Sequence, residues 1–152
     1  MARYCACVLL SLLSCFWSVA GATEERETRH LLKAFVGNTH THDDDNGLTL
    51  GVGYEYRLTP LLAVSALGEY AGGQVDTWVV GPGIVVYPHK RLSLVAMPAV
   101  ELHGDASEFL FRLGVGYEFE AGDEVVVIPE MSVDFVDSET NLVFGVNIGI
   151  PF

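Results

Sequence analysis

The stretch HTHDDDNG at residues 40–47 holds the densest group of metal-ligating residue types in the chain. Imidazole nitrogens and carboxylate oxygens bind divalent metals, and the weak candidate ligands are His40, His42, Asp43, Asp44 and Asp45. The order does not match a calcium-binding loop, because alignment on Gly47 puts His42 where an aspartate is needed and Gly53 where the bidentate glutamate belongs. Asn46-Gly47 is typical of a tight hairpin turn. We therefore expect solvated turn charge and no bound metal here.

Hydrolytic chemistry would need a nucleophile within reach of a base. The candidate pairs are His103 with Ser107, and the histidines of residues 40–47 with the neighbouring aspartates. Serine is sparse after residue 22, and all three cysteines lie in the first fifteen residues, at positions 5, 7 and 15. We therefore expect no catalytic residues, no thiolate or disulfide chemistry in the folded part of the chain, and no cofactor.

The first 22 residues have the pattern of a secretion signal. Arg3 precedes the apolar run CVLLSLLSCFWSVA, and Ala20-Gly21-Ala22 is a small-x-small cleavage pattern. Lipidation at Cys15 is a disfavoured alternative, because the apolar run continues beyond it. We predict a cleaved signal peptide over residues 1–22, a short periplasmic tail over 23–30 and a folded domain over 31–152.

Composition limits the class of protein and the class of partner. The 152 residues suit one domain, and half of them are hydrophobic. Asp and Glu number 20 against 8 Lys and Arg, which gives a formal net charge of −12. Such an acidic chain repels a phosphate backbone, so we exclude nucleic acid as a partner.

After residue 30 the chain consists of eight stretches of alternating character, separated by turn sequences such as DDDNG, AGGQVD and EAGDE. No stretch has a helical period and all connections are short, which predicts antiparallel hairpins in a meander. We place the strands at residues 31–40, 47–58, 61–71, 76–88, 91–103, 107–120, 124–136 and 141–152.

The sixth stretch shows the alternation most clearly. Its odd positions from Phe109 to Phe119 are all large and apolar, whereas Glu108, Arg112 and Glu118 stand at even positions. Aromatic residues flank aliphatic ones along the apolar row, as in the two interfacial girdles of a membrane barrel. The girdle residues we assign are Tyr54, Tyr56, Phe109, Phe111, Tyr117 and Phe119. The first and fourth stretches are ambiguous, because both of their faces carry apolar residues.

Alternation alone does not say which face lies inside, because a soluble lipocalin-like barrel has the same period. An eight-stranded barrel has an interior that side chains just fill, and the large apolar residues of eight strands would overfill it. The opposite face is rich in glycine, which suits a crowded lumen. We therefore predict that the apolar face points outward into lipid, where closure satisfies every backbone hydrogen bond. An amphipathic soluble sandwich is the alternative.

The chain resembles the small eight-stranded outer-membrane β-barrel proteins of Gram-negative bacteria, the porin-like group that includes outer-membrane proteins A, X and W. The resemblance rests on the leader, the eight amphipathic strands and the ending LVFGVNIGIPF. That ending is similar to the C-terminal signal read by the barrel-assembly machinery, with alternating residues Phe144, Val146, Ile148, Ile150 and Phe152. The resemblance implies a closed antiparallel eight-stranded up-and-down transmembrane barrel in the cell outer membrane, with short turns at both ends.

The family is functionally mixed and includes lipid A deacylases and palmitoyltransferases. The deacylase signature His-x-Ser-Asn is absent, because Gly104-Asp105-Ala106 follows His103. We therefore expect a non-catalytic protein with a structural or surface-interaction role. The alternatives are a narrow pore for small solutes and a lipid-modifying enzyme. The expected partners are outer-membrane lipid and lipopolysaccharide, and the assembly machinery during biogenesis. Divalent cations bound at an acidic outer rim are the less favoured alternative to solvated turn charge there.

By parity, the lumen receives a polar network made of Glu55, Arg57, Glu69, Glu101, His103, Arg112, Glu118, Glu130 and Asp134. Such charges must be paired, protonated or hydrated, and we expect them to plug the lumen. LGVGYEY at 50–56 recurs as LGVGYEF at 113–119, either by duplication of a four-stranded half or by convergence. In either case Glu55 and Glu118 are expected in comparable inward positions on opposite sides of the barrel.

Overall fold

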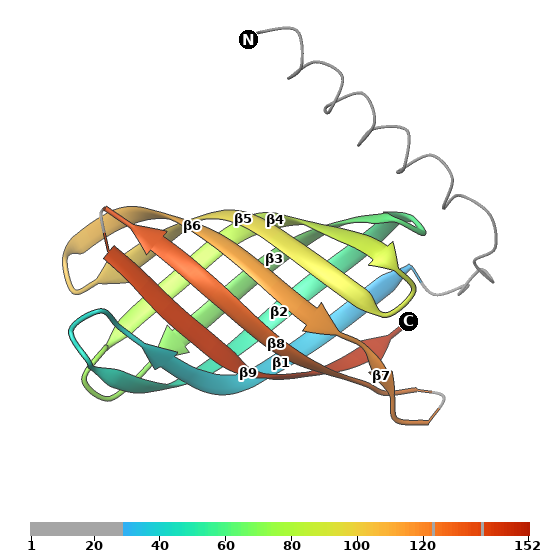
Figure 1. Cartoon of the computed structure of the whole chain (residues 1–152), viewed down its shortest axis with the longest axis horizontal. Coiled ribbons are helices and arrows are strands. Elements are labelled where there is room, and N and C mark those ends of the chain that lie inside the picture. The colour runs from blue at the N-terminus through green and yellow to red at the C-terminus, as the bar shows by residue number, and fades with distance from the viewer. Residues whose placement is uncertain (1–28, 123, 138) are drawn as a thin grey trace, which may run out of the picture.

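The computed structural model describes residues 29–122, 124–137 and 139–152, so the predicted signal peptide and most of the predicted tail lie outside the described residues. The described part of the chain forms a single β-sheet (Figure 1). Its strands are β1 (His30–His40), β2 (Asn46–Thr59), β3 (Leu62–Ala71), β4 (Thr77–His89), β5 (Leu92–His103), β6 (Ala106–Tyr117), β7 (Phe119–Glu120), β8 (Val126–Val136) and β9 (Glu139–Pro151). Within these residues no helix is long and apolar enough to cross a membrane.

The sheet closes on itself into a barrel. Each long strand pairs antiparallel with the next long strand, and β1 also pairs with β9, from Leu31↔Pro151 to His40↔Leu142. The two-residue β7 continues β6 beyond Glu118, and both pair with β8. The chain therefore crosses the barrel eight times. The predicted fold class, a closed antiparallel eight-stranded up-and-down barrel, is confirmed, and the strand limits differ from those predicted by no more than two residues.

The two ends of the barrel differ in what they carry. The described ends of the chain lie at one end, here called the terminus end, where the turns after β2, β4 and β7 also lie (Figure 1). The turns after β1, β3, β5 and β8 lie at the opposite end, here called the loop end. Tight reversals there use backbone in the left-handed region, at Asp44, Gly73, Gly104 and Asp137. In the meander that the sequence predicts, alternate turns such as these four are expected at the same end.

The outward face is apolar along every long strand. Its exposed side chains include Val52 and Phe109, each 66% exposed, and Trp78 at 53%. The two ambiguous strands divide in the same way, since Leu32 of β1 and Val80 of β4 point out. A soluble monomer rarely exposes so much contiguous apolar surface. The fold therefore presents a belt suited to lipid.

The lumen is less polar than the sequence predicts. A cluster of buried hydrophobic residues from β3, β4, β5, β6 and β8 lies inside it, made of Ala63, Val79, Val85, Tyr87, Val95, Met97, Ala99, Leu110 and Val136. Leu110 is fully buried, although it stands on the even, otherwise polar face of β6. The expectation that the apolar residues point outward was therefore incomplete. Apolar side chains can fill the space between paired charges at low cost, because an aliphatic group has no polar atom that needs a hydrogen-bond partner.

Glycines on the lumen face let other side chains occupy the interior. Gly37 and Gly145 lie opposite each other on β1 and β9. A Cβ atom at Gly145 would lie 2.6 Å from the Gly37 Cα and 2.7 Å from the Phe35 ring. The Phe35 ring therefore covers the glycine pair and fills the space that two side chains would need.

Two prolines interrupt the wall between β4 and β5. The ladder runs from Trp78↔Leu102 to Val80↔Val100 and resumes at Ile84↔Ala96. Pro82 and Pro98 fall opposite each other in this gap, and neither has an N–H to donate. Both rings face outward.

Candidate functional site in the barrel lumen

Arg112 occupies the centre of the lumen network and is only 1% exposed. Its Nε and Nη2 donate to the two carboxylate oxygens of Asp134 at 2.6 and 2.8 Å, and its Nη1 donates to Glu69 at 2.5 Å. Arg112 and Asp134 are directly opposed on β6 and β8, whereas Glu69 reaches across from β3. Such bidentate, charge-assisted bonding offsets the cost of burying these groups.

A second ion cluster lies nearer the terminus end. Glu55 of β2 accepts from the Tyr87 hydroxyl at 2.5 Å and lies 3.3 Å from the Lys33 ammonium. Arg57 Nε lies 3.6 Å from Glu55, and its Nη2 donates to Glu118 at 2.9 Å. The Arg57 guanidinium also stacks 4.2 Å from the centre of the Tyr87 ring.

The repeated segments place their glutamates as the internal repeat predicts. Glu55 and Glu118 both point inward near the terminus end, and Arg57 contacts both carboxylates. Because Arg57 contacts both carboxylates, its side chain reaches from β2 across the lumen to Glu118, between β6 and β7. Whether the two halves arose by duplication stays a hypothesis.

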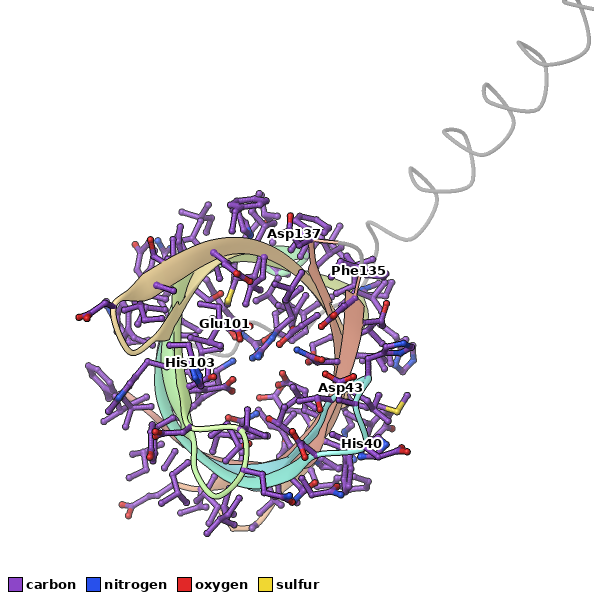
Figure 2. The ribbon with its side chains drawn as sticks, turned by 90° about the vertical axis from the view of Figure 1, so that its left-hand side faces the viewer. His40, Asp43, Glu101, His103, Phe135 and Asp137 are labelled. Atoms are coloured by element: carbon purple, nitrogen blue, oxygen red, sulfur yellow. The ribbon has the colours of Figure 1, made fainter. Side chains whose placement is uncertain are left out.

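The other lumen residues predicted from the sequence, Glu130, Glu101 and His103, lie near uncharged polar side chains or at the mouth of the barrel. Asn147 Nδ2 donates to Glu130 at 2.8 Å, and Ser132 Oγ donates to the other Glu130 oxygen at 3.3 Å. Glu101 and His103 lie inside the ring at the loop end (Figure 2). His103 Nδ1 lies 3.2 Å from the Thr77 hydroxyl. All nine residues predicted for the lumen therefore lie on the inward face, with His103 exposed at its mouth.

Two small cavities, each of about 20 Å³, lie on either side of Arg112 and Glu69. Each has room for about one water molecule. The unpartnered hydroxyl of Ser65 belongs to a residue lining the first cavity, and the unpartnered amide oxygen of Asn141 to one lining the second. Ordered water at these points would satisfy both groups, and the Arg112 ion pairs separate the two positions.

Sequence reasoning missed two members of the network, Lys33 and Tyr87. Both lie on the strands whose faces were ambiguous, because Leu31 and Phe35 accompany Lys33 on the inner face of β1 and Val85 accompanies Tyr87 on β4. The signal that would have found Lys33 is the cost of an unpaired cation on a lipid-facing strand.

The outward aromatic residues gather towards the two ends. Tyr54, Tyr56, Tyr117 and Phe119 lie towards the terminus end, and Phe109 and Phe111 lie towards the loop end. The sequence assignment omitted Tyr70 and Trp78, whose rings lie 5.0 Å apart near the loop end.

The C-terminal segment forms the closing seam. The alternating residues of the predicted assembly signal, Phe144, Val146, Ile148, Ile150 and Phe152, lie on the outward side. The Phe152 ring stacks 5.3 Å from the His30 imidazole, and the backbones of the two residues exchange hydrogen bonds of 2.9 and 3.2 Å.

The histidine–aspartate turn does not assemble a metal site among the residues described. His40 Nδ1 lies 3.1 Å from the Asn46 amide oxygen, and His40 Nε2 lies 3.7 Å from Asp44. No group of three or more His, Cys, Asp or Glu side chains in the described residues is placed to hold a metal ion. The other pairing considered, His103 with Ser107, is not formed as a hydrogen bond, because His103 contacts Thr77 and Ser107 lies opposite Leu102.

Comparison with known proteins identifies the fold. No family model matches the chain, and no curated protein sequence matches it. Among solved structures, the N-terminal β-barrel domain of Pseudomonas aeruginosa OprF is similar, with a TM-score of 0.66 and 11% identity over 82% of this chain and 98% of that one.

Two further solved structures have the same fold. The attachment invasion locus protein Ail of Yersinia pestis has a TM-score of 0.56 and 14% identity over 81% of this chain and 97% of that one. Neisserial surface protein A has a TM-score of 0.56 and 9% identity over 81% and 96%. The chain therefore has the closed eight-stranded barrel fold of the small outer-membrane β-barrel proteins.

Proposed function

We propose that the chain is an integral outer-membrane protein of a Gram-negative bacterium, exported with a cleaved signal peptide, with a structural or surface-interaction role and no catalysis. The observation that carries the proposal is a closed backbone ladder whose outward face is apolar. That combination is stable in hydrocarbon and unfavourable in water. The similar solved structures, which come from outer-membrane barrels, support the same location.

The barrel is oriented with the terminus end in the periplasm and the loop end outside. Lipid and lipopolysaccharide surround it, and the barrel-assembly machinery reads the β9 segment during biogenesis. The loop end carries the acidic turn residues, among them Asp43, Asp44, Asp76 and Asp105. Divalent cations can bridge such carboxylates to the phosphates of lipopolysaccharide.

The negative charge of the loop end argues against binding of polyanions by this chain. The Ail structure was determined with a heparin analogue, sucrose octasulfate. In the described part of this chain, every Lys and Arg lies in the lumen or at the terminus end: Arg29, Lys33, Arg57, Lys90, Arg91 and Arg112. A sulfated polysaccharide would therefore meet like charge at the loop end, and a cationic partner is favoured.

The lumen is proposed to be closed at rest. Arg112 joins β3, β6 and β8 across the centre, and the spaces beside it hold about one water each. A narrow pore for small solutes is the second candidate function, and it is favoured by the charged and polar side chains, such as Glu69 and Arg112, that contribute to the lining of both spaces.

Refolded protein in lipid vesicles and planar bilayers tests both proposals. Wild-type protein is expected to insert, to require detergent or lipid for a compact fold, and to give no discrete conductance steps. Compact folding in buffer without detergent would overturn the membrane assignment. Discrete steps that disappear in Glu55→Gln or Glu118→Gln would overturn the closed lumen and establish the pore.

A further inference from the structure

The strand β6 has a free edge at the loop end. On one side it pairs with β5 along its whole length, from His103↔Ala106 onward. On the other side its pairing with β8 begins only at Leu110↔Val136. Among the residues that the structure describes, 106–109 therefore have a paired strand on one side only, over about 13 Å at 3.3 Å per residue. Because alternate residues of an antiparallel strand direct their N–H and C=O to opposite sides, about two of these four present both groups to the open side.

The free edge borders a notch in the rim of the barrel. The notch, here called the rim notch, has a volume of about 680 Å³ and is lined by Ser107, Glu108, Phe109, Phe135, Val136, Asp137, Glu139 and Thr140. The β5–β6 hairpin forms one wall, and the β8–β9 hairpin forms the other. Phe135 and Asp137 mark the second wall on the rim in Figure 2. The shape suits an extended chain lying beside β6 with its end over the last residues of β8.

The side chains of the rim notch combine aromatic surface with negative charge. Phe109 and Phe135 are both well exposed, and Glu108, Asp137 and Glu139 contribute carboxylates from the two walls. No Lys or Arg of the described residues lies at this end of the barrel. An added strand would therefore be attracted if it carried lysine or arginine, and apolar residues at alternate positions would contact the two phenylalanines.

We propose that the rim notch binds an extended, lysine- or arginine-bearing segment of another polypeptide, which adds to β6 as a further strand. The proposal rests on the surface-interaction role proposed above and specifies its partner. Strand addition supplies affinity through backbone hydrogen bonds, and alternate side chains supply specificity. A second copy of this chain is the less favoured occupant, because edge-to-edge pairing of two β6 strands brings the carboxylates of both copies together.

The test uses full-length refolded protein in detergent micelles and three synthetic peptides. The first is a hexapeptide of alternating Lys and Val, the second alternates Glu and Val, and the third is the Lys–Val peptide with alternate backbone nitrogens methylated. The Lys–Val peptide is expected to bind and to slow hydrogen exchange of the amides in residues 106–109. Methylation keeps the charge and removes about two hydrogen bonds, so it is expected to weaken binding about tenfold. The Glu–Val peptide is expected not to bind.

Charge reversal at the notch supplies the second arm. The double variant Glu108→Lys/Glu139→Lys is expected to lose the Lys–Val peptide and gain the Glu–Val peptide. The matched control Asp44→Lys/Asp45→Lys makes the same change of charge in the β1–β2 turn, at the same end of the barrel, and is expected to keep the original preference. Equal loss in both variants would show general electrostatic attraction and overturn the proposal.

Three other results would also overturn it: equal binding of the methylated peptide, no binding of the Lys–Val peptide to folded barrel, and self-association through β6. Insertion into vesicles is measured separately, by protection from protease and by heat-modifiable electrophoretic mobility. If the barrel inserts but does not bind the Lys–Val peptide, only the proposal that the rim notch binds a strand is refuted. If the barrel does not insert, the membrane assignment is refuted.

Discussion

Removal of the Arg112 side chain is the sharpest test of how the lumen is stabilised. The substitution Arg112→Met keeps much of the apolar length of the side chain and removes the guanidinium. It leaves the carboxylates of Glu69 and Asp134, both more than nine-tenths buried, without the three hydrogen bonds of 2.5 to 2.8 Å that they share with Arg112. Breaking a buried ion pair from one side costs about 3–5 kcal/mol, so the free energy of unfolding is expected to fall by about that amount.

Equilibrium urea unfolding in lipid vesicles measures the loss, with the fluorescence of Trp78 as the reporter because that side chain faces outward. The triple variant Arg112→Met/Glu69→Gln/Asp134→Asn removes the stranded charges as well, and is expected to recover roughly half of the loss or more. Lys90→Met, in the exposed β4–β5 turn, is the control and is expected to change stability by less than about 0.5 kcal/mol. A single variant within about 1 kcal/mol of wild type, or a triple variant as unstable as the single one, would refute the reasoning.

Three further predictions concern the wall of the barrel. Val115→Arg puts a charge on the lipid-facing row of β6 and is expected to cost about 2–4 kcal/mol in vesicle unfolding; a neutral effect would place that row away from lipid. Gly145→Ala is expected to destabilise by about 1–3 kcal/mol because its Cβ meets the opposite strand, whereas Gly68→Ala, which meets nothing within 4 Å, is expected to be tolerated; similar thermal stability of the two variants would contradict this. Phe152→Ala removes the ring that stacks on His30 and is expected to lower the yield of folded barrel in cells and in assisted refolding, as measured by heat-modifiable mobility; a wild-type yield would show that the terminal ring is dispensable.

The sequence was sufficient for the wall of the barrel and insufficient for the pairing inside it. Period-two alternation is a local property, so the strands and their outward faces follow from neighbours in the chain. The partners of Arg112 cannot be found from its neighbours in the chain, because Asp134 and Glu69 lie 22 and 43 positions away. Which of several inward carboxylates reaches an arginine depends on the tilt and stagger of the strands, and these are set only when the whole sheet closes.

The mixture of apolar and charged side chains inside the lumen was also beyond the pattern. Leu110 stands in the polar row of β6, and other members of its buried cluster, such as Val85 and Met97, come from β4 and β5. The sequence shows that these residues are apolar. On β4, however, both faces carry apolar residues, so the alternation does not say which face points into the lumen. The glycines predicted a crowded interior correctly, because missing side chains at positions such as Gly145 make room for Phe35.

The pairing of β1 with β9 constrains the order in which this molecule can be made. Leu31 finds its partner Pro151 about 120 positions later, so the first strand synthesised must wait for the last. Every shorter chain is an open ribbon with two unsatisfied edges, prone to stick to other chains. Completion of the polypeptide is therefore a precondition for closing this barrel, and a chain truncated before β9 leaves the outer edge of β1 without its partner strand.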